Sequence, residues 1–325
     1  MRQFLTLVFG GLTAVAAGIG LVYGAISLVR LAPAIPGLGA SKISLSSVAD
    51  AIMPYPTDGT SISGIARTVR WSASQEEDQS GFVPPLLPID KAGRVTAAAY
   101  IVRDLSDPAV PIMSRDPDRL LPIASLSKLV TAVMARRLIP SAAHITMSPS
   151  IISSYGNTAG FMVDETISAG DLIYPLLMVS SNEAAEAYAA WYGRPAFIAA
   201  MNDFAQSIGA YRTYFADPSG LSPQNVSTAN DMAIILDWIR KNDPDLISIT
   251  QLKSKTVRGH AWVNPTHFLS WSDYLGGKNG YTPEADLTAA SLFRAGAAGD
   301  VYAVVVLGSS ARDLDEFTLL SKLQK

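Results

Sequence analysis

A long apolar run opens the chain. No charged residue occurs over positions 4–29, and a helix of that length, rising about 1.5 Å per residue, spans the roughly 30 Å hydrocarbon core of a bilayer. Cleaved signal peptides have shorter apolar regions, of about 7 to 15 residues. We therefore predict an uncleaved transmembrane helix within residues 1–31, with cleavage near Ala32-Pro33-Ala34 as the alternative.

Residues 32–93 carry no sustained apolar period. They are rich in Pro, Ser, Gly and Ala, include the acidic stretch Glu76-Glu77-Asp78, and end in a proline-rich segment. Such a composition favours an extended linker over a packed domain. The pattern thus predicts an anchor over 1–31, a tether over 32–93 and a folded domain over 94–325.

Short apolar runs indicate strands at both ends of the folded domain. Residues 95–103 and 110–113 flank Asp107-Pro108 and predict a hairpin. Residues 287–294 and 301–307 predict two more strands, joined by a turn of small residues.

Between these strand segments, apolar residues recur at the spacing typical of helices. A strongly apolar helix is predicted over 125–138, after Pro122 and before Pro140. Further helices are predicted over 169–192, 194–208, 227–241 and 312–325. Strands early and late, with helices between them, predict an α+β fold: an antiparallel sheet whose first and last strands meet, flanked by helices, with a helical lobe inserted.

Composition and charge exclude several classes of function. With 49% hydrophobic and 16% charged residues, the 325-residue chain can bury a globular core. A formal net charge of -3 without a basic stripe argues against nucleic acid as a partner. The absence of cysteine removes disulfides and thiol nucleophiles, and none of His144, His260 and His267 lies in a His-Glu-x-x-His motif. These features argue against metal catalysis.

Ser125 and Lys128 form the only Ser-x-x-Lys in the chain. Three residues apart on a helix, they face the same side, and a lysine buried in an apolar helix has a lowered pKa and can take a proton from serine. Ser125 is therefore a candidate nucleophile and Lys128 its candidate base. The alternative is a lysine that extends from a core helix to solvent, since a lone Ser-x-x-Lys often arises by chance.

Two further polar motifs follow along the chain. In Ser180-Ser181-Asn182, Ser180 can relay a proton and Asn182 can orient a substrate amide, although Ser and Asn also cap helices. In Gly276-Gly277-Lys278-Asn279-Gly280-Tyr281, glycines let a positive charge and backbone N–H groups approach an anion. A glycine-rich turn with a solvated lysine is the alternative for this third motif.

The three motifs in this order resemble the D-alanyl-D-alanine carboxypeptidases, the low-molecular-mass penicillin-binding proteins. The resemblance covers about residues 95–325 and extends to Pro122-Ile123-Ala124, Asp217-Pro218-Ser219-Gly220-Leu221-Ser222 and Ser227-Thr228-Ala229. It implies a β-lactamase/transpeptidase-like fold. It also implies a serine peptidase that acts on peptidoglycan stem peptides, is inhibited by β-lactams, and works outside the cytoplasmic membrane to which the N-terminal helix anchors it.

The resemblance further implies a role for each matching residue. It places the nucleophile at Ser125, the base at Lys128 and the proton relay at Ser180. It places substrate contacts at Asn182, Lys278, Asn279, Gly280 and Tyr281. The backbone N–H groups of Ser125 and Tyr281 would form the oxyanion hole, and no cofactor is implied.

Two departures bear on specificity. The family usually has Thr after the third-motif lysine, where this chain has Asn279, whose amide still donates hydrogen bonds but leaves a strict carboxypeptidase preference open. The chain also ends soon after the late strands, as in shorter family members, some of which are endopeptidases that cut peptide cross-links. Carboxypeptidase is the expected activity, and D-alanyl endopeptidase is its first alternative.

Two other functions are kept as alternatives. A β-lactamase shares the Ser-x-x-Lys motif but needs a carboxylate to activate a deacylating water, for which Asp164-Glu165 is the candidate. A non-catalytic binder of cell-wall peptides would explain Asn279, but a buried Ser-Lys pair without catalytic use would carry a desolvation cost for no benefit.

Overall fold

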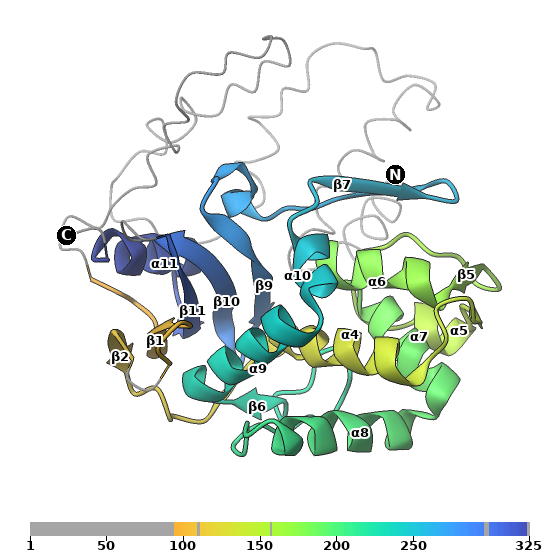
Figure 1. The fold of residues 1–325 in the computed structure, drawn as a ribbon. Helices are drawn as coiled ribbons and strands as arrows, with labels where there is room; N and C mark the ends of the chain where they lie inside the picture. The colour runs from red at the N-terminus through yellow and green to blue at the C-terminus, as the bar shows by residue number, and fades with distance from the viewer. Residues whose placement is uncertain (1–93, 109–110, 157, 296–298, 324–325) are drawn as a thin grey trace, which may run out of the picture. The chain divides into compact units, whose positions relative to one another are not determined.

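The structure is a computed structural model, and it describes residues 94–108, 111–156, 158–295 and 299–323 (Figure 1). The predicted anchor over 1–31 and the predicted tether over 32–93 lie outside the described residues. Within the described ranges, no helix combines the length and the apolar character needed to cross a membrane.

Five antiparallel strands form the central sheet in the order β2-β1-β11-β10-β9. The strands are β1 (Ala99–Asp104), β2 (Met113–Arg115), β9 (Tyr274–Thr282), β10 (Asp286–Ala295) and β11 (Asp300–Ser309). β1 lies beside β11, with Ala99 opposite Leu307, so the early and late segments meet as predicted. The early hairpin is also confirmed, although β1 begins at Ala99 and β2 extends to Arg115.

β10 and β11 are buried on both faces, which explains their nearly continuous apolar sequences. Val304 and Val306 of β11 pack in one hydrophobic core together with helix α11 (Arg312–Ser321). Val305 and Leu307 point to the opposite face and pack in the core of the helical lobe. Because side chains alternate along a strand, the sheet separates two cores, and α11 covers the face away from the lobe (Figure 1).

The helical lobe is built around α4 (Ser127–Leu138), which is buried from Ser127 to Ala135. The other lobe helices are α5 (Pro149–Ile152), α6 (Ala169–Met178), α7 (Asn182–Tyr192), α8 (Arg194–Ser207), α9 (Ala229–Asn242) and α10 (Pro244–Thr250), with α6 to α9 packed around α4 (Figure 1). The helices predicted over 125–138, 194–208 and 227–241 are therefore confirmed, each within two residues at either end.

The single helix predicted over 169–192 is wrong. The structure has α6 and α7 instead, separated at residues 179–181. Ser180 has a left-handed backbone, with φ of 59°, which a helix cannot accommodate. Ser181 then caps α7, because its hydroxyl accepts a hydrogen bond from the Ala184 backbone N–H at 2.9 Å.

Several short elements were not predicted. They are the helices α5 and α10, the 3-10 turns η3 (Ala124–Leu126) and η4 (His267–Ser270), and three two-stranded ladders: β3 (Leu121–Pro122) with β6 (Val226–Ser227), β4 (His144–Thr146) with β5 (Thr166–Ser168), and β7 (Ser254–Val257) with β8 (His260–Val263). The β7–β8 hairpin packs against the loop before β5. Trp262 Nε1 of the hairpin donates a hydrogen bond to the Ala159 carbonyl oxygen of that loop at 3.0 Å.

A buried carboxylate, Asp315 of α11, ties the start of the described chain to its end. Asp315 accepts hydrogen bonds from the backbone N–H groups of Thr96 (2.7 Å) and Ala97 (2.9 Å). It also accepts from the hydroxyls of Thr96 (2.8 Å) and Ser309 (2.6 Å). These four donors satisfy a charge whose burial would otherwise be costly.

Candidate active site

The candidate nucleophile Ser125 lies in the turn η3, directly before α4. Its predecessor Ala124 has a left-handed backbone, with φ of 48°, which is uncommon for a residue with a side chain. A methyl group on Gly220 would lie 1.9 Å from the Ala124 carbonyl oxygen, and one on Gly280 would lie 2.8 Å from the Ser125 backbone nitrogen. Two glycines therefore allow two distant segments to approach the backbone of Ser125.

Lys128 lies one helical turn after Ser125 and is fully buried. Its amine Nζ makes hydrogen bonds to Ser125 Oγ at 3.0 Å, to Asn182 Oδ1 at 2.7 Å and to the Ser219 carbonyl oxygen at 2.5 Å. The two carbonyl oxygens can only accept, so a neutral amine would keep its two hydrogens on them. Its lone pair would then point to Ser125 Oγ, which is the geometry that a base needs.

Burial lowers the pKa of Lys128 from 10.5 to about 7. The negative charges of Asp217, Glu183 and Glu186 act in the opposite direction and favour the protonated amine. A base with a pKa near neutrality combines a substantial unprotonated fraction with useful basicity. Lys128 thus has the buried position that its predicted role requires, and its action as a base stays a prediction.

The turn that begins at Asp217 contains Ser219, whose carbonyl oxygen is the third hydrogen-bond partner of Lys128. The Asp217 carboxylate accepts hydrogen bonds from the backbone N–H groups of Ser219 (2.7 Å), Gly220 (2.6 Å) and Ser222 (2.6 Å). The same turn presents the Ser219 carbonyl to Lys128 and brings Gly220 against Ala124. This segment was singled out in the sequence without a role, and the structure shows that it packs directly on the Ser125-Lys128 pair.

The second motif lies at the break between α6 and α7. Asn182 is buried between Lys128 and the loop before β5. Its side-chain Nδ2 donates a hydrogen bond to the Tyr155 carbonyl oxygen at 2.6 Å, and its Oδ1 accepts one from Lys128 Nζ. The hydroxyl of Ser180 is buried and makes no hydrogen bond in the described structure. A buried hydroxyl without a partner, on a strained backbone, is a feature found at functional sites.

The third motif lies on β9, an edge strand of the sheet. Lys278 and Gly280 are two residues apart on this strand and face the same side, and Gly280 contacts the backbone of Ser125. Tyr281 follows directly, with an exposed side chain. The predicted oxyanion pair, the N–H groups of Ser125 and Tyr281, is thus brought into one region of the structure.

Residues 88–310 match the family model for D-alanyl-D-alanine carboxypeptidase. The chain belongs to this family. A solved D-alanyl-D-alanine carboxypeptidase from Mycobacterium tuberculosis H37Rv is similar, with a TM-score of 0.65 and 27% identity over 74% of this chain and 95% of that chain. The transpeptidase-like fold implied by the sequence motifs is therefore confirmed.

Two D-alanyl-D-alanine endopeptidases are also similar in sequence to this chain. The D-alanyl-D-alanine endopeptidase of Escherichia coli (strain K12) is 35% identical over 182 residues, which cover 54% of this chain and 56% of that protein. The D-alanyl-D-alanine endopeptidase of Pseudomonas aeruginosa is 32% identical over 217 residues, 62% of this chain and 68% of that protein. The chain thus matches little more than half the length of the Escherichia coli relative.

The sequence analysis did not identify Arg312, which lies near the third motif in the structure. Arg312, the first residue of α11, donates from Nη1 to the Gly280 carbonyl oxygen at 3.3 Å. Burial, and then the positive charges of Lys128 and Arg312, hold the pKa of Lys278 well below its usual range. Lys278 and Arg312 line one pocket beside β9. No local pattern marks Arg312, because it lies beyond two strands in the sequence and meets β9 only through the sheet.

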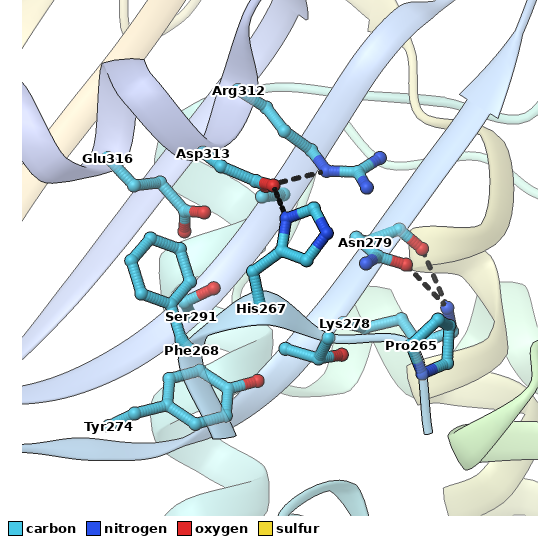
Figure 2. Close-up of a pocket in the computed structure, with 12 residues that line it drawn as sticks. Pro265, His267, Phe268, Tyr274, Lys278, Asn279, Ser291, Arg312, Asp313 and Glu316 are labelled. Carbon is cyan, nitrogen blue, oxygen red and sulfur yellow. Dashed lines mark hydrogen bonds and ion pairs between the residues drawn. The ribbon is translucent and has the colours of Figure 1, made fainter. Parts of the chain in front are cut away.

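A small pocket lies on the α11 side of β9, lined by residues that include Lys278, Asn279, Arg312 and Glu316 (Figure 2). The Asn279 side chain lines this pocket, and its Oδ1 is 3.4 Å from Lys278 Nζ, which is closer to the Asn279 carbonyl oxygen at 2.7 Å. The amide that replaces the usual Thr therefore lies beside both Lys278 and Arg312.

Glu316→Gln should make the protein more stable near pH 8. Burial raises the pKa of Glu316 from 4.5 to about 8, so the folded protein holds this proton while the unfolded chain loses it. Stability therefore falls as the pH rises between these two values, by on the order of 1–4 kcal/mol. The free energy of unfolding, measured with urea at several pH values, should lose this slope in Glu316→Gln but not in the exposed control Glu284→Gln. An unchanged slope would contradict the assignment.

Of the two carboxylates considered for a β-lactamase water, Asp164 and Glu165, the second is engaged elsewhere. Glu165 Oε1 pairs with His260 Nε2 at 2.5 Å, and Glu165 Oε2 accepts from the Met162 backbone N–H at 3.0 Å. These contacts join the loop before β5 to the β7–β8 hairpin. Glu165 thus has a structural role in the described chain, and nothing in its contacts directs it to Ser125.

Proposed function

We propose that the chain is a serine-type D-Ala-D-Ala carboxypeptidase that acts on peptidoglycan stem peptides through an acyl-enzyme at Ser125. The observation that carries the proposal is the fully buried Lys128 amine, held by two carbonyl oxygens and 3.0 Å from Ser125 Oγ. Membership in the D-alanyl-D-alanine carboxypeptidase family supports the substrate class.

In the first step, Ser125 Oγ attacks the carbonyl carbon of the terminal peptide bond and its proton passes to Lys128. The electron pair of the carbonyl moves to the oxygen, where the N–H groups of Ser125 and Tyr281 stabilise the negative charge. The position of Ser125 before α4 adds the favourable field of a helix N-terminus to its own N–H.

In the second step, the intermediate collapses and the peptide C–N bond breaks. The leaving amine takes the proton from Lys128 through Ser180, whose unpaired hydroxyl can accept from one group while it donates to the other. A water molecule then attacks the ester carbonyl, gives its proton to Lys128 and releases the acyl group, and Ser125 recovers its proton.

The substrate would be held from two sides. Asn182 would contact the substrate amide, while the strand around Gly280 offers backbone groups at the open edge of the sheet. The anionic end of the peptide would be held by Lys278, Asn279 and Arg312, which lie together at the same edge.

We also propose that residues 1–31 anchor the protein in the cytoplasmic membrane and that residues 32–93 tether the catalytic domain on its outer face. The uncharged run over 4–29 supports the anchor. The location of the polymer that such an enzyme cleaves supports the outer side, because the flanking charges do not decide the orientation.

The proposal is tested by incubating the full chain with a fluorescent penicillin. We expect a covalent label that survives denaturation, is blocked by unlabelled penicillin, and maps by mass spectrometry to the peptide that contains Ser125. Folded protein without label that leaves the antibiotic intact would favour a non-catalytic binder. Rapid destruction of the antibiotic without stable label would favour a β-lactamase.

A peptide assay separates the proposed activity from its first alternative. A carboxypeptidase releases D-alanine from a linear peptide that ends in D-Ala-D-Ala, whereas an endopeptidase opens a cross-linked dimer. Asn279 is the specific observation that keeps the endopeptidase open, since an amide stands where the family usually has a hydroxyl to bind a terminal carboxylate.

A further inference from the structure

We propose that Asp313 is a positioning residue that holds Arg312 against strand β9, where the guanidinium selects peptides with a free terminal carboxylate. The proposal rests on the proposed function for the place of the substrate. It goes further by naming the residue that orients the selecting cation.

Asp313 lies between two basic side chains and contacts both. Its Oδ1 accepts from Arg312 Nε at 3.1 Å, and its Oδ2 accepts from His267 Nδ1 at 2.6 Å (Figure 2). Arg312 reaches β9 at the same time, through Nη1 and the Gly280 carbonyl oxygen at 3.3 Å. The guanidinium is therefore fixed at two points, one on α11 and one on the strand that carries the third motif.

These two contacts leave most of the guanidinium available. They use the N–H of Nε and one N–H of Nη1, while a guanidinium has five N–H groups. The other three lie on the two terminal nitrogens, which is the edge that pairs with a carboxylate in bidentate fashion. Figure 2 shows the Arg312 head group on the side of β9 where Asn279 lies.

The position of Arg312 does not favour the stability of the fold. It is the first residue of α11, where the positive end of the helix dipole disfavours a cation. It is also close enough to Lys278 for its charge to depress the pKa of that lysine. Local features that oppose stability are typical of functional sites.

Asp313 is what makes this placement tenable. The side chains of Arg312 and Asp313 are only 20% and 22% exposed, so their pairing is stronger than that of a solvated surface pair. Without the Asp313 charge, Arg312 would lose the only carboxylate to which it is hydrogen-bonded in the described residues, and its side chain could turn away from β9. The His267 side chain is 73% exposed and closes the outer side of the carboxylate.

The test measures binding, so that it does not depend on turnover. In the full chain carrying Ser125→Ala, the dissociation constant is measured for an acetylated peptide ending in D-Ala-D-Ala and for the same peptide as a terminal carboxamide. We expect Asp313→Asn to weaken binding of the carboxylate peptide about tenfold and to change binding of the carboxamide less than about twofold. Asp313→Glu, which keeps the charge, should restore part of the loss.

A double-mutant cycle shows whether Asp313 acts through Arg312. In an Arg312→Gln background, Asp313→Asn should cause no further loss of carboxylate preference, because the group that it positions is already absent. Asp245→Asn, the same substitution at an exposed carboxylate of α10, serves as the control. Equal losses for both peptides, or additive losses in the double variant, would overturn the proposal.

The outcome is separable from that of the proposed function. If penicillin labels the wild-type chain but the two peptides bind equally to the Ser125→Ala protein, the acyl-enzyme stands and the role of Asp313 is overturned. If no label forms but the carboxylate preference exists and falls in Asp313→Asn, the positioning role stands and the catalytic proposal fails.

Discussion

Ser125→Ala should abolish covalent labelling by penicillin, and Lys128→Met should slow it by about 10²–10⁴-fold. The serine variant has no atom that can form the ester. The lysine variant keeps the hydroxyl but has no base, since the Lys128 amine is the group that lies 3.0 Å from Ser125 Oγ. Lys241→Met, which removes a half-exposed lysine paired with Asp237, is the matched control and should label at the wild-type rate.

The pH dependence of labelling follows from the same lysine. Because burial lowers the pKa of Lys128 to about 7, the unprotonated base should accumulate as the pH rises through that value, and the acylation rate should rise with it. The rate constant would be measured with a fluorescent penicillin from about pH 5 to about pH 9. A rate that is flat over this range, or a Lys128→Met protein that labels normally, would remove Lys128 from the role of base.

Stability should respond to Lys128 in a defined direction. The pKa of Lys128 is about 7 in the folded protein and 10.5 in the unfolded chain. Between these two pH values the unfolded chain therefore binds more protons than the folded protein. Stability therefore rises with pH across that window. Lys128→Met should remove this contribution, which urea unfolding at several pH values would detect.

Gly220→Ala should lower the acylation rate by about 100-fold or more, whereas Gly209→Ala should leave it nearly unchanged. Both glycines have a left-handed backbone, with φ of 87° and 91°, so both substitutions carry a similar strain of about 1–2 kcal/mol. Only Gly220 has close neighbours, since its added methyl group would lie 1.9 Å from the Ala124 carbonyl oxygen and 2.9 Å from the Ser125 nitrogen.

The comparison of the two glycine variants isolates the contact with Ser125. Penicillin acylation rates and free energies of unfolding would be measured for both. Loss of stability in both, with loss of acylation in Gly220→Ala alone, is the expected pattern. Equal acylation rates would show that the Ala124-Ser125 backbone can move without harm, and the approach of Gly220 would then have no bearing on catalysis.

The sequence was sufficient to predict four of the five strands of the sheet and the proximity of Ser125 and Lys128. The spacing of Ser125 and Lys128 alone indicates that they share one face of a helix, and apolar runs at both ends of the domain predict that β1 meets β11. These features are local, or they follow from the burial of apolar strands. They therefore leave a trace in residue type and period.

The parts that were missed depend on contacts between distant segments. The third acceptor of Lys128 is a backbone carbonyl at Ser219, 91 residues away, and a carbonyl has no signature in residue type. Arg312 reaches β9 through a hydrogen bond to Gly280, 32 residues away in the sequence. The break at Ser180 was hidden because the apolar residues of α6 and α7 continue on either side of it, and tertiary contacts overrode the helical period.

The four hydrogen bonds at Asp315 also lie where a pull on the N-terminal side of the domain would act. The described residues begin at Arg94. The Asp315 carboxylate accepts hydrogen bonds from the backbone N–H groups of Thr96 and Ala97, two to three residues later. A pull on the chain before Arg94 would act first on these hydrogen bonds to Asp315 and on the ladder between β1 and β11. Because β11 and β10 separate β1 from β9 in the sheet, the strand beside Ser125 is not among the segments that such a pull would load directly.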